Sequence, residues 1–206
     1  AIEIYNKAIK IDPNNISPYV NLSSAYLKLK KLNKCEKILN KVKNKNNLFV
    51  LLNLGKLYEA RGNFEKSIIF YKKIYEIDKK FQNISIKIGN LYLSLGKFDL
   101  AKNFQKIAND IYPNNTSIDF TLSNLTDYSL DQSHQDLMIK KLKNNLNLNN
   151  HSKIALSFAL GKSYNDQKDF DNSYKYYDMA NSIRNSTLTN YNLNTEKKYF
   201  ETIKKI

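Results

Sequence analysis

Glycines recur at a fixed interval in this sequence. Gly55 and Gly89 stand 34 residues apart, and the text around them is repeated as well. The segment 53–67, NLGKLYEARGNFEKS, aligns without a gap with the segment 87–101, KIGNLYLSLGKFDLA. A period of this length indicates that the chain stacks copies of one supersecondary unit, each burying its apolar face only against its neighbours.

The residues that repeat form a known motif. Each copy reads Leu or Ile, Gly, two further residues and Tyr, then Gly-x-Phe, as at Gly55, Tyr58, Gly62 and Phe64. This pattern resembles the tetratricopeptide repeat, in which every unit is a pair of helices. The resemblance predicts an all-α fold, a right-handed superhelical solenoid of antiparallel helix pairs, that acts as a scaffold for protein binding.

The array is predicted to run over residues 1–187. The signature returns at Leu160 and Gly161, but it is lost over 116–153, a degenerate unit that keeps only the spacing of two helices. Residues 188–206 are expected to hold a polar linker and a capping or docking helix. Because the sequence starts and stops inside amphipathic helices, we expect an excerpt from a longer protein. The predicted units are a partial unit 1–15, then 16–47, 48–81, 82–115, 116–153 and 154–187.

Two kinds of glycine are expected in the units. Gly55, Gly89 and Gly161 fall within a first helix, where it is expected to cross its partner too closely for a side chain, at a cost of about 1 kcal/mol each in helix propensity. Gly62 and Gly96 fall at the end of a first helix, in the left-handed conformation that glycine enters most easily. Aromatic rings are expected to fill the gaps between neighbouring pairs. These rings are Tyr58, Tyr71, Tyr92, Phe98, Phe104, Tyr164 and Tyr177.

Residues with reactive side chains are few. Cys35 is the single cysteine, so the chain has no internal disulfide, and with two histidines it cannot form a usual zinc site. Cys35 takes the small-residue position of a second helix and is predicted to be a buried, inert thiol. His134 lies beside Ser133 and Asp136, but residues one or two apart on a helix point in different directions. A solvated or capping His134 is therefore predicted, rather than a catalytic one. Asp169 is expected to cap the following helix.

Composition argues against several classes of function. The repeat uses all five glycines, no phosphate-binding loop motif is present, and no run of about 18 apolar residues could span a membrane. We expect no catalytic residues, no cofactor and no metal in this chain, and a reducing, cytoplasmic location. The net charge of +14 comes almost wholly from Lys, since only Arg61 and Arg184 could contact phosphate or bases bidentately. A solvated basic surface is favoured over specific nucleic-acid binding.

A binding groove is predicted on the concave wall formed by the first helices. The informative positions lie two before and two after the Leu or Ile of each Leu-Gly-like pair, with neighbouring amides. An apolar ladder flanked by Asn and Lys suits an extended peptide. The same ladder could be filled by the parent's own next domain, or lie partly buried between first helices and contact no ligand. The groove residues are Val20, Asn21, Ser24, Leu52, Asn53, Lys56, Ile86, Asn90, Phe120, Asn124, Phe158 and Lys162.

The last quarter of the chain carries a second resemblance. Residues 158–181 read FALGKSYNDQKDFDNSYKYYDMAN, and Asn181, Arg184 and Tyr191 are not required by the generic repeat. This segment is similar to the last repeat of bacterial proteins in which tetratricopeptide repeats precede a sulfotransferase domain. The resemblance implies an N-terminal arm that docks, through Asn181, Arg184 and Tyr191, a downstream domain using 3′-phosphoadenosine 5′-phosphosulfate.

Two other interpretations stay open. The chain could be a free-standing adaptor that collects a peptide partner, which the sequence following residue 206 would distinguish. It could also be a basic solenoid that binds nucleic acid, in which case binding would weaken steeply with salt.

Overall fold

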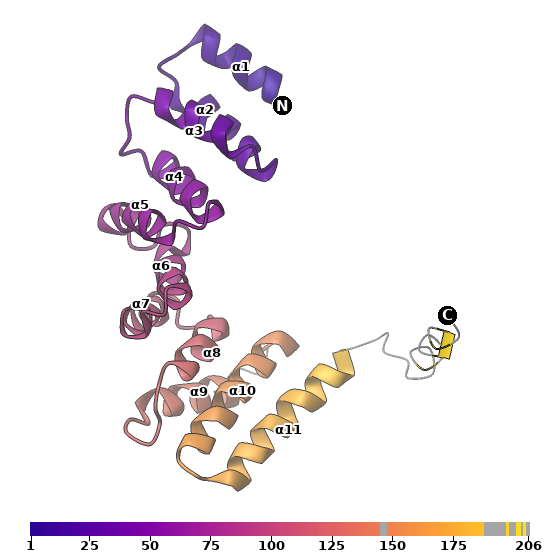
Figure 1. Ribbon diagram of the computed structural model, residues 1–206. Helices are drawn as coiled ribbons and strands as arrows, with labels where there is room; N and C mark the ends of the chain where they lie inside the picture. Colours follow the sequence, from indigo (N-terminus) through magenta and orange to yellow (C-terminus); the bar gives the residue numbers. More distant parts are fainter. Residues whose placement is uncertain (145–147, 188–196, 198–200, 203, 205–206) are drawn as a thin grey trace. The chain divides into compact units, whose positions relative to one another are not determined.

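The computed structural model describes residues 1–144, 148–187, 197, 201–202 and 204 (Figure 1). Over these residues every regular element is a helix, which confirms the predicted all-α fold. The chain divides into two compact units, Ala1–Pro113 and Asn114–Ile206. The single array over 1–187 and its unit boundaries stay predictions.

The first unit is a series of helical hairpins. Its elements are α1 (Ile2–Ile11), α2 (Ile16–Lys28), α3 (Leu32–Lys41), α4 (Leu48–Ala60), α5 (Phe64–Ile77), the 3-10 turn η1 (Phe81–Asn83), α6 (Ile84–Ser94) and α7 (Phe98–Ile111). Helix α1 packs on α2, and the pairs that follow are α2 with α3, α4 with α5, and α6 with α7. The short connections within these pairs make them antiparallel hairpins.

The second unit is built around one long helix. Its elements are α8 (Thr116–Asn124), α9 (Ser133–Asn144), α10 (Asn150–Asp166) and α11 (Phe170–Thr187). Helix α10 packs against α8, α9 and α11, so it is the centre of this unit (Figure 1). The linker and helix predicted over 188–206 lie almost entirely outside the described residues.

Short polar side chains start many of the helices. Asn15 and Asn47 accept backbone N–H groups at 3.1 and 3.0 Å at the starts of α2 and α4. Asn115 and Asn149 do the same for α8 and α10. The Asp169 carboxylate accepts the Asn172 N–H at 3.1 Å, which confirms the predicted cap of α11. These side chains satisfy N–H groups that have no partner within their own helix.

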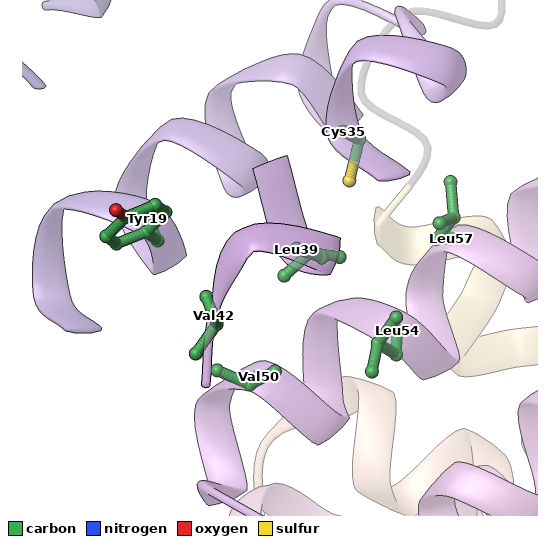
Figure 2. Packing of buried hydrophobic residues seen from close by; sticks show 7 residues of the cluster. All are labelled: Tyr19, Cys35, Leu39, Val42, Val50, Leu54 and Leu57. Atoms are coloured by element: carbon green, nitrogen blue, oxygen red, sulfur yellow. The ribbon is translucent and has the colours of Figure 1, made fainter. Parts of the chain in front are cut away.

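Apolar side chains from α2, α3 and α4 form the core at the start of the first unit. Figure 2 shows this cluster, with Cys35 and Leu39 of α3 pointing toward Leu54 and Leu57 of α4. Cys35 is fully buried, and burial raises the pKa of its thiol to about 11. The predicted burial is confirmed, and a raised thiol pKa disfavours the reactive thiolate, as expected for an inert cysteine. The cluster consists of Tyr19, Cys35, Leu39, Val42, Val50, Leu54 and Leu57.

The turns that follow the first helices use the left-handed conformation. Gly62 and Gly96 have φ values of 72° and 68°, which confirms their predicted role. Lys30 and Lys168 follow α2 and α10 in the same way, with φ values of 54° and 61°. A lysine in this conformation carries a steric cost that glycine avoids.

Side chains of the second helices fill the space beside the other three glycines. A Cβ on Gly55 would lie 2.1 Å from the Tyr71 ring, and one on Gly161 would lie 2.7 Å from the Tyr177 ring. A Cβ on Gly89 would lie 2.9 Å from Nε2 of Gln105. The predicted close crossing is confirmed, and the atoms that leave no room belong to side chains of the partner helix.

Most of the predicted aromatic rings pack between helices, but Tyr71 and Tyr164 do so within their own pair and not between neighbouring pairs, and one ring is exposed. Tyr71 and Tyr92 are buried, and Tyr164 stacks on Tyr176 with ring centroids 5.5 Å apart. Phe98, however, is 61% exposed in the first turn of α7. Its position in the repeat is aromatic, but the side chain points to solvent and fills no gap between helices.

Candidate functional site

The first helices of neighbouring pairs are joined by one asparagine. Asn53 of α4 is 2% exposed. Its amide nitrogen lies 3.0 Å from the Val20 carbonyl, 2.8 Å from the Ser23 hydroxyl and 2.9 Å from the Ser24 hydroxyl of α2. This contact fixes the spacing of α2 and α4, so Asn53 serves the fold and not an exposed ligand.

The predicted groove residues differ in how open they are. Leu52 and Asn53 are buried, and Leu52 is only 3% exposed. The half-buried members are Val20, Ser24, Lys56, Ile86, Phe158 and Lys162. The exposed members are Asn21, Asn90, Phe120 and Asn124. In the first unit the surface of these helices therefore exposes the amides of Asn21 and Asn90.

The exposed amide of Asn90 is oriented by a hydrogen bond from the second helix of its pair. The Nε2 of buried Gln105 in α7 donates to Oδ1 of Asn90 in α6 at 2.9 Å. The Asn90 oxygen is thus occupied, and its NH₂ group has no partner among the described residues. Asn90 is an oriented donor at the surface of α6.

Lys56 is a half-buried lysine whose charge is disfavoured by its surroundings. It is half-buried on α4, and its pKa is lowered by burial and then by the positive charges of Lys87 and Lys28. Glu59 opposes this effect from the next turn of α4. A partly desolvated ammonium among like charges is stabilised by an added anion.

Lys162, the corresponding lysine of the second unit, is engaged within the fold. Its ammonium donates to the Thr126 carbonyl and to the Asp166 carboxylate. It also lies 5.3 Å from the centroid of the Tyr128 ring. Because these contacts hold the loop after α8 against α10, Lys162 has a structural role in the second unit.

A buried polar cluster lies between α8 and α9, and it corrects the expectation for His134. This side chain is 8% exposed, so the predicted solvated or capping histidine is wrong. Its Nδ1 lies 2.6 Å from the Tyr128 hydroxyl and its Nε2 lies 3.0 Å from the Asp119 carboxylate. Lys141 completes the cluster with contacts of 2.7 and 2.8 Å to Asp119, which is fully buried.

The spacing of α9 carried a signal for this cluster. His134, Met138 and Lys141 are separated by four and three residues, which places them on one face of a helix. Met138 is fully buried, so this face is the buried one. Burial, followed by the Asp119 charge, raises the pKa of Tyr128, whose hydroxyl therefore stays protonated. The cluster is an interior hydrogen-bond network that links α8, α9 and the loop between them.

Two further expectations concern metals and membranes. Among the residues that the structure describes, no three His, Cys, Asp or Glu side chains gather as metal ligands would. No helix in the described ranges has the length and apolar character needed to cross a bilayer.

The predicted docking residues are partly described. Asn181 and Arg184 are exposed on α11. Tyr191 lies outside the described residues. The docking role of all three stays a prediction.

Comparison with known proteins agrees with the helix pairs. Models of the tetratricopeptide repeat match residues 4–37, 50–81 and 83–115. The chain carries tetratricopeptide repeats. The solved structure described as YrrB, a TPR protein with an unusual peptide-binding site, superposes with a TM-score of 0.71 at 14% identity, over 91% of this chain and 96% of that one. BtubC (BKLC) from P. vanneervenii superposes with a TM-score of 0.66 at 18% identity, over 93% and 89%. At these identities the likeness shows the fold alone.

Two curated relatives of this tetratricopeptide-repeat chain are members of one assembly. The BBSome complex member BBS4 of Bos taurus is 31% identical over 113 residues, which is 54% of this chain and 21% of that protein. BBS4 of Mus musculus is 33% identical over 95 residues, 45% of this chain and 18% of that protein. The chain thus spans about a fifth of the length of the curated relatives it matches.

Proposed function

We propose that this chain is a non-catalytic scaffold that binds an extended peptide or a partner's surface loop along the first helices of its first unit. The observation that carries the proposal is the oriented amide of Asn90, held by Gln105 at 2.9 Å on α6. Asn21 is a second exposed amide, on α2. Oriented amide donors match the main-chain carbonyls of an extended peptide.

The comparisons support this proposal in general terms. BBS4 is named as a member of a complex, and YrrB as a protein with a peptide-binding site. The fixed spacing of α2 and α4 through Asn53 adds a physical argument. A surface that is rigid before binding loses less conformational entropy when a ligand settles on it.

A peptide selection with matched amide variants tests the proposal. A peptide selected from a random displayed library on the wild-type chain is labelled, and its affinity is measured by fluorescence anisotropy. We expect Asn21→Ala with Asn90→Ala to weaken binding about tenfold, from the loss of two hydrogen bonds. The control, Asn40→Ala with Asn103→Ala, removes exposed asparagines of α3 and α7 and should leave the affinity unchanged. Equal losses in both variants, or no selectable peptide, would contradict the proposal.

The finer hypothesis places this scaffold before a sulfotransferase domain. It rests on the resemblance of residues 158–206, and the exposure of Asn181 and Arg184 on α11 is consistent with a docking role. On this hypothesis the chain itself does not bind 3′-phosphoadenosine 5′-phosphosulfate, and calorimetry should show no saturable heat. Saturable binding of the donor would overturn the assignment of a donor-free arm. A free-standing adaptor, the alternative, would show no sulfotransferase activity in its full-length form.

A further inference from the structure

Three lysines give the first helices of the first unit a cationic face. Lys28 is the last residue of α2, Lys56 lies half-buried on α4, and Lys87 lies half-buried on α6. Helical spacing puts Lys56 one turn beyond Asn53, whose amide lies 2.9 Å from the Ser24 hydroxyl of α2. Asn90 lies one turn beyond Lys87 on α6 in the same way. Lys87 and the exposed amide of Asn90 are therefore neighbours on the surface of α6.

The lysines of this face lack ion-pair partners in the part of the chain that the structure describes. None of the three lysines forms an ion pair with a described residue. The charge of Glu59 opposes the effect of the other lysines on Lys56, and its Oε2 accepts the Tyr71 hydroxyl at 2.9 Å. Burial and the repulsion from Lys87 and Lys28 both disfavour the charged form of Lys56 and lower its pKa.

We infer that this face binds an acidic, extended protein segment, with Asp or Glu carboxylates beside Lys56 and Lys87 and main-chain carbonyls at Asn90. The inference rests on the proposed function and adds the chemistry of the ligand. A carboxylate replaces the missing counter-charge of a half-buried ammonium, and such charge-assisted hydrogen bonds are stronger than neutral ones. Lys28, which is exposed, adds longer-range attraction that salt screens.

Burial removes one predicted apolar step from this face. Leu52, the apolar step predicted between these lysines, is 3% exposed and packs inside the protein. A peptide side chain has no room to replace it without opening α4. The Leu52 step is therefore closed to a ligand, and half-buried Val20 and Ile86 are the predicted apolar steps that remain on the first helices of this unit.

The only arginine in the sequence of the first unit, Arg61, is not free to bind nucleic acid. Arg61 lies 2.8 Å from the Glu36 carboxylate and 3.1 Å from Asn33, so it is already paired. The face is left with lysines, which act as point charges and cannot make the bidentate contacts that arginine makes with phosphates. Among macromolecules that carry negative charge, an acidic protein segment is the better match.

The test compares two labelled peptides and two double variants of the whole chain. One peptide alternates Glu with Ala, and the other carries Gln in place of every Glu. We expect the Glu peptide to bind at low salt and the Gln peptide to bind at least about tenfold more weakly, as expected for the loss of charge-assisted hydrogen bonds. K56Q with K87Q should weaken the Glu peptide about tenfold. K37Q with K106Q removes the same charge from exposed positions on α3 and α7 and should have little effect. Circular dichroism checks that both variants are folded.

Each other outcome overturns the inference in a recognisable way. Equal weakening by the two double variants means diffuse attraction to a basic protein. Equal binding of both peptides means that the peptide scaffold stands while its preference for acidic ligands is wrong. A single-stranded oligonucleotide that binds more tightly than the Glu peptide, and loses that affinity in K56Q with K87Q, assigns the face to nucleic acid. If the Glu peptide does not bind, the inferred preference for acidic ligands is wrong. The selection from the random peptide library then tests the proposed scaffold function separately.

Discussion

At the residue scale, the Tyr71 ring explains why position 55 is glycine. Tyr71 is fully buried, and its hydroxyl donates to Glu59 at 2.9 Å. Packing and this hydrogen bond hold the ring where a Cβ of residue 55 would need to lie. At Gly89 the obstacle is the amide end of Gln105, a side chain with more rotatable bonds. The two glycines occupy the same repeat position but differ in the side chain that faces them.

This difference predicts unequal effects of alanine. Gly55→Ala is expected to lower the free energy of unfolding by about 2 kcal/mol, because the Tyr71 ring must move within a packed core. Gly89→Ala is expected to stay within about 1 kcal/mol of wild type, because the gain in helix propensity offsets the shift of Gln105. Urea denaturation measures both values. Equal losses in the two variants would show that the facing side chain does not decide the cost.

The left-handed lysines predict a stabilising substitution. Lys168→Gly is expected to raise the free energy of unfolding by about 1 kcal/mol, because φ is 61° there and glycine adopts this conformation without a steric penalty. Lys106→Gly is the matched control, since Lys106 is an exposed residue inside α7 with negative φ, where glycine lowers the helix propensity. The control should be destabilising. A loss of stability in Lys168→Gly as well would contradict the argument.

At the scale of the helix, α8 and α9 are joined by polar contacts where the repeat signature is missing. The unit 116–153 has no glycine and has no aromatic residues at the signature positions of the repeat. Its buried contacts include Asp119, His134 and Tyr128 together with fully buried Met138. A hydrogen-bonded network of this kind requires all its members, since a buried polar group without a partner is costly.

Removing the central histidine is therefore expected to destabilise the second unit. His134→Ala leaves the Tyr128 hydroxyl without its buried partner and should lower the free energy of unfolding by about 2 kcal/mol or more. His151 is exposed, and His151→Ala should change stability by less than about 0.5 kcal/mol. Chemical denaturation of the two variants makes the comparison. A His134→Ala protein as stable as wild type would mean that the network contributes nothing to stability.

At the scale of the whole molecule, the dominant electrostatic property is an excess of lysine. The formal net charge is +14 from 33 basic and 19 acidic residues. Ion pairs such as that between Arg61 and Glu36 neutralise a small part of this charge. The remaining cations repel one another, and this repulsion favours the unfolded chain.

Salt should therefore stabilise this protein. Raising sodium chloride from low to about physiological ionic strength shortens the Debye length to about 8 Å and screens the repulsion. We expect the melting temperature to rise by about 3 °C, which corresponds to about 1 kcal/mol for a chain of this size. K37Q with K106Q, which carries less charge, should show a smaller rise in a calorimetric scan. An unchanged or lower melting temperature in salt would show that ion pairs outweigh the repulsion.

The repeat itself could be predicted from the sequence, because its determinants are local. The interval between Gly62 and Gly96 marks helix ends that need a left-handed residue, and such a requirement depends only on neighbouring backbone. The burial of Cys35 followed from its repeat position for a similar reason, since equivalent positions of a second helix face the same partner. Local geometry and periodicity were sufficient for the fold class.

The surface that remains for a partner was decided by the tertiary structure. Leu52 and Asn53 occupy predicted groove positions, but packing of α4 against α2 buries both. The partners of His134 come from a different helix and a loop, and Phe98 points to solvent at an aromatic position of the repeat. These outcomes depend on which side chains of neighbouring helices compete for the same space. Sequence period places a residue on a helix face, but only the packed neighbours determine whether that residue is covered.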